Sequence, residues 1–276
     1  LEKGAVGGEA GAEWFRVTAR YDFMGVRVDA FTIASLHEAI AEVITSRRKA
    51  IVANVNIHAM NIAWEQPWFR DFLNAAPHVF CDGHGVMLGA RLCGLRIPEK
   101  ITYAHWFPVF CRFCAEKRFS LFFLGGAPGV AEEAKRRLEA QNPGLIIAGT
   151  HDGFFNKEIG SAPNRAVIEQ INRAEPDVLL TSFGMPLQER WLRENWDEVH
   201  ARVALTGGAC LDYMAGRARR PPAWMADHGL EWFGRMLYEP GRLWKRYLVG
   251  NPLFYGRMLR WRITGRGGVS RNREAV

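Results

Sequence analysis

Polar residues and glycines follow four short apolar runs of this 276-residue chain, and residues of these types can build a catalytic or binding site. In parallel sheets, ligands bind beyond the carboxyl ends of the strands. A carboxylate at such an edge, such as Asp82, could take the proton from an attacking hydroxyl group. Asp82 could instead cap the following helix, and the residues alone leave both interpretations open. The four segments are Asn54–Asn56, Cys81–Gly85, Leu124–Gly129 and Phe183–Glu189.

Two of these segments could bind a substrate. Gly125, Gly126 and Gly129 lead into a helical pattern, so their backbone N–H groups could face a phosphate at the positive end of the helix dipole. The same glycines could serve only a turn that needs positive φ, and their spacing matches neither the dinucleotide fingerprint nor the P-loop. Gln188 follows a Gly-x-Pro turn, where its amide could bond a sugar or a uracil edge, or be an ordinary surface group.

The histidines and cysteines form neither a metal pattern nor a disulfide pattern. The histidines are scattered without the spacing of metal ligands, so we expect no metal and no other cofactor. Five cysteines are an odd number, which disfavours a disulfide framework. Cys111 and Cys114 lie three residues apart and would share one helix face, so we expect buried thiols there.

Apolar runs alternate with helical patterns along most of the chain, which predicts the elements that position these segments. Ser35 and Glu38 resemble a capping box at the start of the first helix. The alternation predicts an α/β fold with a Rossmann-like, mainly parallel sheet covered by helices on both faces. Strands are predicted at 22–28, 50–56, 76–81, 120–126, 145–151, 177–184 and 201–206, and helices at 35–47, 61–74, 86–93, 106–117, 129–141, 165–173 and 191–196.

Residues 217–276 differ in composition from the rest of the chain. They hold 13 Lys and Arg against 4 Asp and Glu, whereas residues 1–216 hold 23 against 25. Nine aromatic residues are interleaved with these cations, which suits a membrane surface, a nucleic acid or a solvated helical face. We predict a flexible lead-in at 1–20, an α/β domain at 21–216, a membrane-associating helical appendage at 217–262 and a flexible tail at 263–276.

The hydropathy of the sequence indicates where in the cell the protein is expected. Hydrophobic residues make up 48% of the chain, enough for a sizeable core. No run approaches the roughly 20 apolar residues that span a bilayer. The start of the sequence is acidic and rich in Gly and Ala, unlike a signal peptide. We therefore expect a cytoplasmic protein, and the basic, aromatic tail adds the expectation that it associates peripherally with the inner face of the cell membrane.

The strand-end segments and the tail together resemble the WecG/TagA/CpsF family of glycosyltransferases. The resemblance implies a fold of the GT-E type and metal-independent, inverting transfer of a sugar from a UDP-sugar to a polyprenyl-diphosphate-linked acceptor. An anionic membrane surface and a possible homo-oligomer are further expected partners, and no nucleic acid is expected. The matching stretches, between about Ile51 and Arg260, are NVNIHAMNIA, DGHGVMLGARLCG with PEKIT, FFLGGAPGVAEEA, GTHDGFF, GMPLQERW and GLEWFGRMLYEPGRLWKRYLVGNPLF.

The resemblance also implies roles for single residues. Asp82 falls on the family's catalytic aspartate and Asn56 on its active-site asparagine, while Asn54 stands where Thr is common. Lys100 stands where Arg is usual, which keeps the charge but loses the two-pronged guanidinium. The predicted catalytic residues are Asp82, Asn54 and Asn56, the predicted donor-binding residues are Gly125, Gly126, Gly129, Gln188 and Lys100, and the predicted diphosphate and membrane contacts are Arg235, Arg242 and Lys245.

Other functions remain open at this point. A nucleotide-binding oxidoreductase could use the glycine turn, although the acidic ribose-binding residue that follows a GxGxxG pattern is missing. A non-catalytic module that binds membrane or RNA could use the tail. The transferred sugar is also open between N-acetylmannosamine, glucose and a uronic acid, and Asn54 could shift the donor preference.

Overall fold

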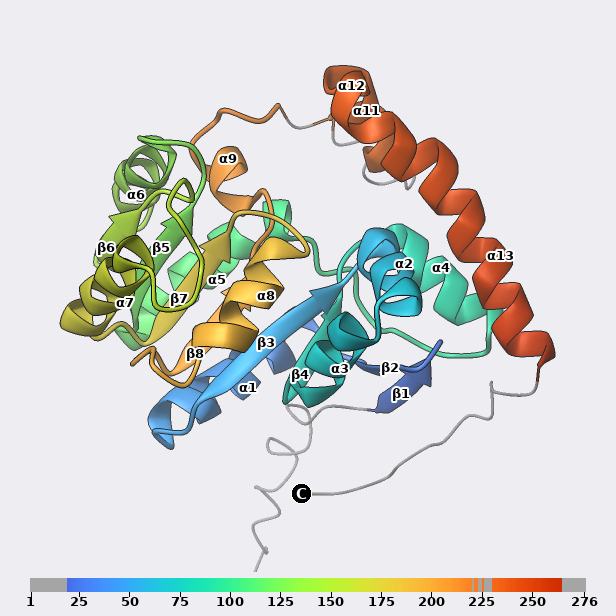
Figure 1. The fold of residues 1–276 in the computed structure, drawn as a ribbon, viewed down its shortest axis with the longest axis horizontal. Coiled ribbons are helices and arrows are strands. Elements are labelled where there is room, and N and C mark those ends of the chain that lie inside the picture. The colour runs from blue at the N-terminus through green and yellow to red at the C-terminus, as the bar shows by residue number, and fades with distance from the viewer. Residues whose placement is uncertain (1–18, 220, 223–224, 226–229, 265–276) are drawn as a thin grey trace, which may run out of the picture.

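An eight-stranded sheet forms the centre of the computed structural model, which describes residues 19–264 except 220, 223–224 and 226–229 (Figure 1). The strands are β1 (Arg20–Phe23), β2 (Val26–Asp29), β3 (Ala50–Val55), β4 (His78–Cys81), β5 (Ser120–Gly125), β6 (Ile146–His151), β7 (Val178–Ser182) and β8 (Val203–Thr206). Their order is β1-β2-β4-β3-β8-β7-β5-β6. Every pair except β1 with β2 is parallel, which confirms the predicted mainly parallel sheet.

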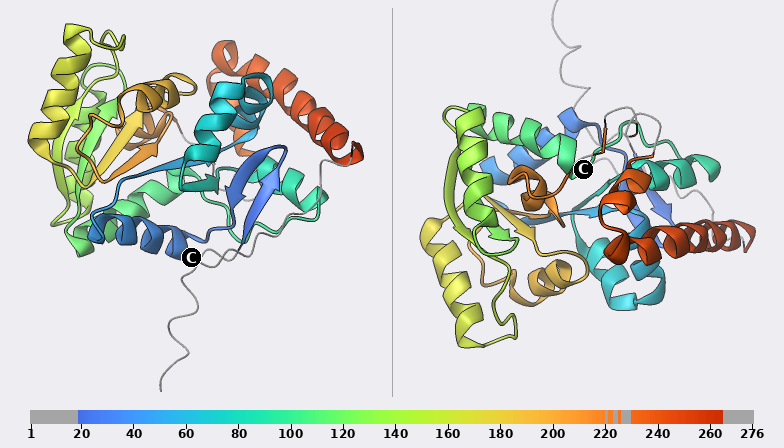
Figure 2. Two further views of the ribbon diagram at one scale, coloured as in Figure 1. Left: turned by 60° about the horizontal axis from the view of Figure 1, so that its bottom comes forward. Right: turned by 90° about the horizontal axis from the view of Figure 1, so that it is seen from above.

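Helices cover both faces of this sheet, as predicted (Figures 1 and 2). Successive residues of a strand point to opposite faces, and in β5 Phe122 and Leu124 enter one core layer while Leu121 and Phe123 enter the other. The first layer contains α2 (Ile57–Glu65), α3 (Pro67–Ala75), α4 (His84–Leu92), α7 (Ala162–Ala174) and α8 (Leu187–Asn195). The second contains α1 (Ile33–Thr45), α5 (Tyr103–Lys117), α6 (Val130–Gln141) and α9 (Cys210–Met214). Cys111 and Cys114 of α5 are buried free thiols, as expected.

The single strand predicted at 22–28 is wrong, because the chain reverses there. Met24 and Gly25 have φ values of 55° and 82°, and two successive residues with positive φ make a two-residue hairpin turn. The Gly25 N–H donates to Asp22 Oδ1 over 2.9 Å and tightens the turn. Met24 is buried within an apolar run, so the sequence lacked the usual polar turn signal.

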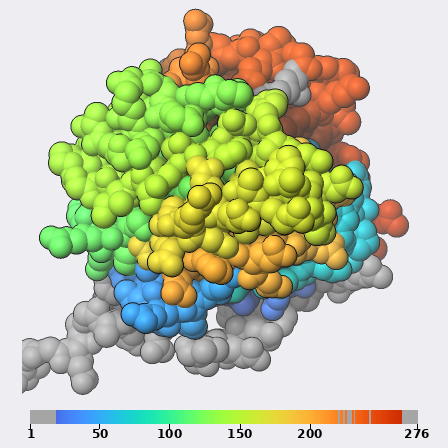
Figure 3. Space-filling model, turned by 60° about the vertical axis from the view of Figure 1, so that its left-hand side comes forward, coloured from blue at the N-terminus to red at the C-terminus, as the bar shows by residue number. Residues whose placement is uncertain are grey.

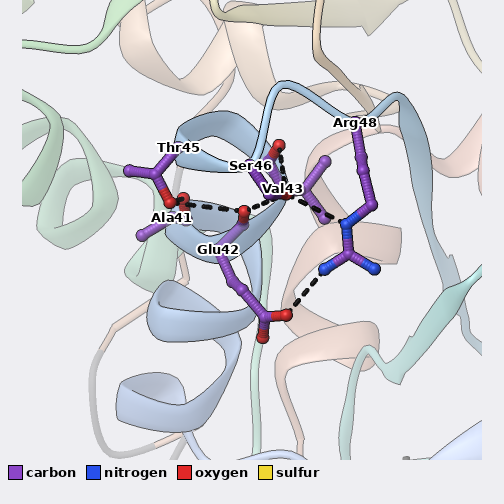
Figure 4. Close-up of polar contacts among 6 residues, drawn as sticks. All are labelled: Ala41, Glu42, Val43, Thr45, Ser46 and Arg48. Carbon is purple, nitrogen blue, oxygen red and sulfur yellow. Dashed lines mark hydrogen bonds and ion pairs between the residues drawn. The ribbon is translucent and has the colours of Figure 1, made fainter.

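The first helix begins and ends two residues earlier than predicted. Thr32, not Ser35, is the N-cap. The Thr32 N–H donates to the Ser35 hydroxyl over 2.9 Å, and the Ser35 N–H donates to the Thr32 hydroxyl over 3.1 Å. At the other end the Ser46 hydroxyl donates to the Glu42 carbonyl over 2.6 Å (Figure 4). Arg47 then takes a φ of 55°, which is incompatible with a further helical turn.

The long helix predicted at 61–74 is two helices, α2 and α3. Pro67 has no backbone N–H and holds the preceding residue out of the helical region. Gln66 accordingly has φ −121° and ψ 102° and separates the two helices. This break turns α3 against the β1–β2 hairpin, where the Asn74 side chain donates to the Gly25 carbonyl over 2.9 Å.

The C-terminal region consists of α11 (Glu231–Tyr238), α12 (Pro240–Trp244), the π-helix η1 (Lys245–Val249) and α13 (Gly250–Ile263). α13 packs on the body of the protein through buried Phe254, Met258 and Trp261. The Asn61 side chain of α2 donates to the Gly250 carbonyl over 2.8 Å, at the start of α13. Part of the predicted appendage is therefore anchored to the α/β body, and α11 and α12 lie beside the start of α13, on the upper side in Figure 1.

Replacing Phe254 by Ala is expected to lower the free energy of unfolding by about 3–5 kcal/mol, because a ring fully buried under α13 is lost. Its ring centroid lies 6.1 Å from that of Phe23 in the hairpin. Urea unfolding followed by tryptophan fluorescence measures the change. Leu259→Ala, on the exposed side of the same helix, is the control and should cost less than about 0.5 kcal/mol. Equal effects would contradict this packing.

The structure bears only partly on two expectations, the flexible ends of the chain and the lack of a membrane-spanning segment. The predicted flexible segments lie mostly in 1–18 and 265–276, outside the described residues. Among the helices that are described, none is both long and apolar enough to cross a membrane.

Candidate active site

Three polar side chains meet at the carboxyl ends of the neighbouring strands β4, β3 and β8. Asp82 follows β4, the buried Asn54 lies near the end of β3, and the buried Thr206 ends β8. Asn54 Nδ2 donates to Asp82 Oδ2 over 3.1 Å, and Thr206 Oγ1 donates to Asn54 Oδ1 over 2.9 Å. The structure thus brings two predicted residues together and adds Thr206, which the sequence interpretation missed.

Asp82 is presented at this edge and is not a helix cap. The N-cap of α4 is Gly83, with φ 97°, and no side chain caps that helix. The Asp82 N–H donates to the Val55 carbonyl over 2.8 Å, which fixes the point at which the half-buried carboxylate leaves the sheet. This geometry fits a carboxylate that accepts a proton from a bound substrate.

Two titratable groups beside Asp82 are held neutral. Burial raises the pKa of the Cys81 thiol, and the Asp82 carboxylate raises it further. Burial, with smaller contributions from Cys210 and Asp82, holds the pKa of Tyr103 well above its ordinary value. Neither group is a base near neutral pH, and the role of Asp82 as proton acceptor stays a prediction.

Asn56, the third predicted catalytic residue, caps α2. Its Oδ1 accepts a hydrogen bond from the Ala59 N–H over 3.1 Å. A cap uses only the oxygen of the side chain, and the amide N–H groups of Asn56 can donate to a substrate. Its part in catalysis stays a prediction.

Gln188 ties two loops of the site together. Its side chain is fully buried, and its Oε1 accepts hydrogen bonds from the N–H groups of Gly184 and Gly208, over 3.2 and 3.0 Å. Its Nε2 donates to Glu189 Oε1 over 2.8 Å. In this arrangement Gln188 positions the loops after β7 and β8, and direct contact with the donor stays a prediction.

Glu189 is a buried carboxyl that the sequence interpretation passed over, although it is adjacent to Gln188. The residue is 1% exposed, and burial raises the pKa of Glu189 to about 7, against the smaller lowering effect of the Gln188 hydrogen bond. Its Oε2 is buried without a hydrogen-bond partner among the described residues. A carboxyl in this situation favours its protonated form.

The folded protein should therefore lose stability between about pH 4.5 and about pH 7 through Glu189. The folded state holds this proton more tightly than the unfolded chain, so stability falls as pH rises through that window, by at most about 3 kcal/mol. Glu189→Gln should unfold with a smaller fall in stability over the same window, as measured by urea unfolding at several pH values. Glu158→Gln, at an exposed position, should leave the wild-type slope intact, and an unchanged slope in Glu189→Gln would disprove the assignment.

The backbone conformation explains why glycines occupy the predicted phosphate-binding turn. Gly125, Gly126 and Gly129 have φ values of 147°, 74° and 82°. A Cβ on Gly125 would lie 2.4 Å from the Ser182 carbonyl oxygen. The Gly126 N–H already donates to that oxygen over 3.1 Å, and its carbonyl accepts from the Gly153 N–H over 2.8 Å. Phosphate binding by this turn stays a prediction, and the N–H of Gly126 is engaged within the protein.

The topology nevertheless favours a ligand between β5 and β7. β5 leads outward to β6, whereas its neighbour β7 leads inward to β8. Connections that leave adjacent strands in opposite directions open a crevice at their carboxyl ends. A shallow hollow of about 430 Å³ lined by Glu169, Asn172, Arg173 and His200 lies at the opposite edge, before β7 and β8, and is not part of this site.

The predicted cations come from two parts of the chain, the loop after α4 and the C-terminal helices. Lys100 lies in the loop after α4, where Glu99 Oε2 accepts a hydrogen bond from the Ile33 N–H over 2.6 Å. The Arg235 guanidinium lies 5.3 Å from the ring centroid of Tyr213, in α9, which follows β8. Lys245 is exposed at the start of η1, and the side chain of Arg242 lies outside the described part of the chain.

The sequence of the chain matches the model of a protein family described as "Glycosyl transferase WecG/TagA/CpsF family" over residues 21–268. The chain belongs to this family. It is therefore a glycosyltransferase, which excludes both the oxidoreductase and the non-catalytic module. Within the described residues, no group of three or more His, Cys, Asp and Glu side chains is placed to hold a metal ion.

Characterised members of the WecG/TagA/CpsF family resemble the chain over most of its length. A Bacillus subtilis protein is 28% identical over 199 residues, 72% of this chain and 75% of the relative. A Staphylococcus aureus protein is 24% identical over 241 residues, 86% of this chain and 91% of the relative. Both are named N-acetylglucosaminyldiphosphoundecaprenol N-acetyl-beta-D-mannosaminyltransferase.

Proposed function

We propose that this glycosyltransferase moves a sugar from a UDP-sugar to a saccharide linked to a polyprenyl diphosphate, as part of cell-surface polysaccharide synthesis. The names of the relatives support a lipid-linked N-acetylglucosamine as acceptor and N-acetylmannosamine as the first sugar to test. The observation that carries the proposal is the Asp82 carboxylate, presented by β4 next to Asn54. No other function has a comparable observation in its favour.

The chemistry is a single displacement at the anomeric carbon of the donor. The acceptor hydroxyl oxygen attacks this carbon while Asp82 takes the hydroxyl proton. The new C–O bond forms as the bond to the diphosphate oxygen breaks, UDP leaves with the electron pair, and the configuration inverts. Asp82 later releases its proton to solvent.

Cations from the C-terminal region would stabilise the leaving diphosphate. Arg235 contacts Tyr213 of α9, and α9 follows the carboxyl end of β8 as Asp82 follows that of β4. Lys100 belongs to the loop after α4, which the hydrogen bond from the Ile33 N–H to its neighbour Glu99 ties to the start of α1. Charge that develops on the diphosphate is stabilised by such fixed cations.

The surface of the C-terminal helices suits a membrane that carries the acceptor. The exposed apolar side chains of α11, α12 and η1 are Phe233, Leu237, Tyr238, Trp244, Leu248 and Val249. Lys245 and Arg246 lie among them in η1. Apolar and aromatic rings beside cations are typical of helices that lie at an anionic lipid surface. Figure 3, which looks onto the α6–α7 side, has these helices at its upper right edge, behind the surface in view.

Incubation of the protein with a panel of UDP-sugars and a short-chain lipid-diphosphate N-acetylglucosamine acceptor tests the proposal. We expect transfer from UDP-N-acetylmannosamine, inverted stereochemistry by NMR, and undiminished activity in EDTA. Transfer from glucose or a uronic acid instead would correct the expected sugar. Absence of transfer from every UDP-sugar would refute the proposed donor class.

A further inference from the structure

We propose that Thr206 is a positioning residue that fixes the Asn54 amide so that its N–H points at the base Asp82. The proposal rests on the proposed role of Asp82 and extends it to a relay across three strands. The proposal also explains why this chain has Asn at position 54, because the Asn54 amide bonds to both Asp82 and Thr206.

The relay is short and sheltered. Thr206 is 1% exposed and Asn54 is 2% exposed, so neither side chain exchanges its partner for water. The two hydrogen bonds of 2.9 and 3.1 Å run from β8 through β3 to the residue after β4. Backbone pairing holds these strands in register, with Ile51 opposite Ala204 and Val55 opposite Cys81.

The chemistry of the groups gives the relay one direction. An ionised carboxylate only accepts hydrogen bonds, so Asn54 must turn its NH₂ toward Asp82. Its carbonyl oxygen then faces Thr206 and needs a donor, which the Thr206 hydroxyl supplies. Without that hydroxyl, the buried Asn54 oxygen would lose this hydrogen-bond donor, and the amide would no longer be held with its NH₂ toward Asp82.

The relay should tune the base as well as orient it. A hydrogen bond to the charged form of a carboxyl favours that form. Loss of the relay should therefore move the titration of Asp82 to higher pH. Among the described residues, Cys81 and Tyr103 interact with the Asp82 charge and are both held neutral, and the buried Glu189 carboxyl, with a pKa of about 7, acts on Tyr103.

Three variants test the relay by kinetics. Thr206→Val keeps the shape but removes the hydroxyl, and kcat should fall roughly tenfold with an unchanged KM for the donor. Thr206→Ser restores a hydroxyl and should recover most of this loss. Asn54→Asp keeps the shape but places a second carboxylate beside Asp82, and kcat should fall at least roughly a hundredfold.

Thr181→Val is the matched control. Thr181 lies opposite Thr206 in the next strand and is equally buried, but its hydroxyl donates to the Leu205 carbonyl over 3.0 Å. We expect this variant to keep the wild-type kcat and pH profile. If Thr181→Val lowered kcat as much as Thr206→Val does, the effect would come from the loss of a buried hydroxyl in general, and the proposed role of Thr206 would be refuted.

A second measurement does not depend on turnover. NMR titration of the protein with ¹³C-labelled aspartate, assigned with Asp82→Asn, follows the Asp82 carboxyl and excludes the signal of Glu189. The titration midpoint should rise in Thr206→Val, return in Thr206→Ser and stay unchanged in Thr181→Val. An unchanged midpoint in Thr206→Val overturns the relay, whereas full turnover in Asp82→Asn overturns the proposed base and leaves the relay measurable by NMR.

Discussion

Asp82→Asn should lower kcat by roughly a thousandfold, because the amide can no longer take the proton from the acceptor hydroxyl. The substitution changes one atom of a half-buried side chain whose backbone N–H is bonded to Val55, so the fold should persist. Initial rates with saturating UDP-sugar measure kcat. Binding of UDP, followed by calorimetry, should stay within about twofold of wild type, because the predicted contacts of the nucleotide lie elsewhere.

The control for this substitution is Asp71→Asn. Asp71 is exposed on α3, on the body of the protein, and the same change of charge there should leave kcat unchanged. A rate loss in both variants would indicate a general effect of net charge. Undiminished turnover in Asp82→Asn alone would remove Asp82 as the base.

The second large effect is expected on membrane association. Replacing Leu237, Trp244 and Leu248 together by Ser removes three exposed apolar side chains from α11, α12 and η1. At about 1 kcal/mol or more for each side chain that enters the interface, binding to vesicles of anionic phospholipid should weaken by roughly a hundredfold. Vesicle sedimentation measures binding, and transfer to a short-chain, water-soluble acceptor should stay near the wild-type rate.

A matched triple variant tests whether the location matters. Val109, Ile146 and Ile159 are also exposed apolar residues, but they lie in α5, β6 and the loop after β6. Their replacement by Ser should leave vesicle binding unchanged. Equal binding by both triple variants and wild type would rule out α11–η1 as the membrane surface. Substitutions are preferable to truncation at residue 216, because truncation would also remove the buried Phe254 and Trp261 of α13.

The sequence by itself predicted the sheet and the edge at which the site lies. Alternating apolar runs and helical patterns depend only on local spacing, and parallel strands must bring their carboxyl ends to one edge. This argument placed Asn54 and Asp82 near each other before any contact was known. The prediction failed in two places. The Met24–Gly25 turn lies within an apolar run and was predicted as strand, and the first helix is capped by Thr32, three residues before the predicted Ser35.

Only the tertiary structure decided which side chains contact one another at this edge of the sheet. The strand order brings β8 beside β3, so Thr206 meets Asn54 although 152 residues separate them. Gln188 is buried and accepts hydrogen bonds from two backbone N–H groups, so it links the loops after β7 and β8, a contact that the sequence pattern did not indicate. The same holds for α13, whose basic and aromatic composition fitted a free surface, although Phe254 and Trp261 are buried. Hydrogen bonds and burial between distant segments depend on strand order and packing, which local sequence patterns do not encode.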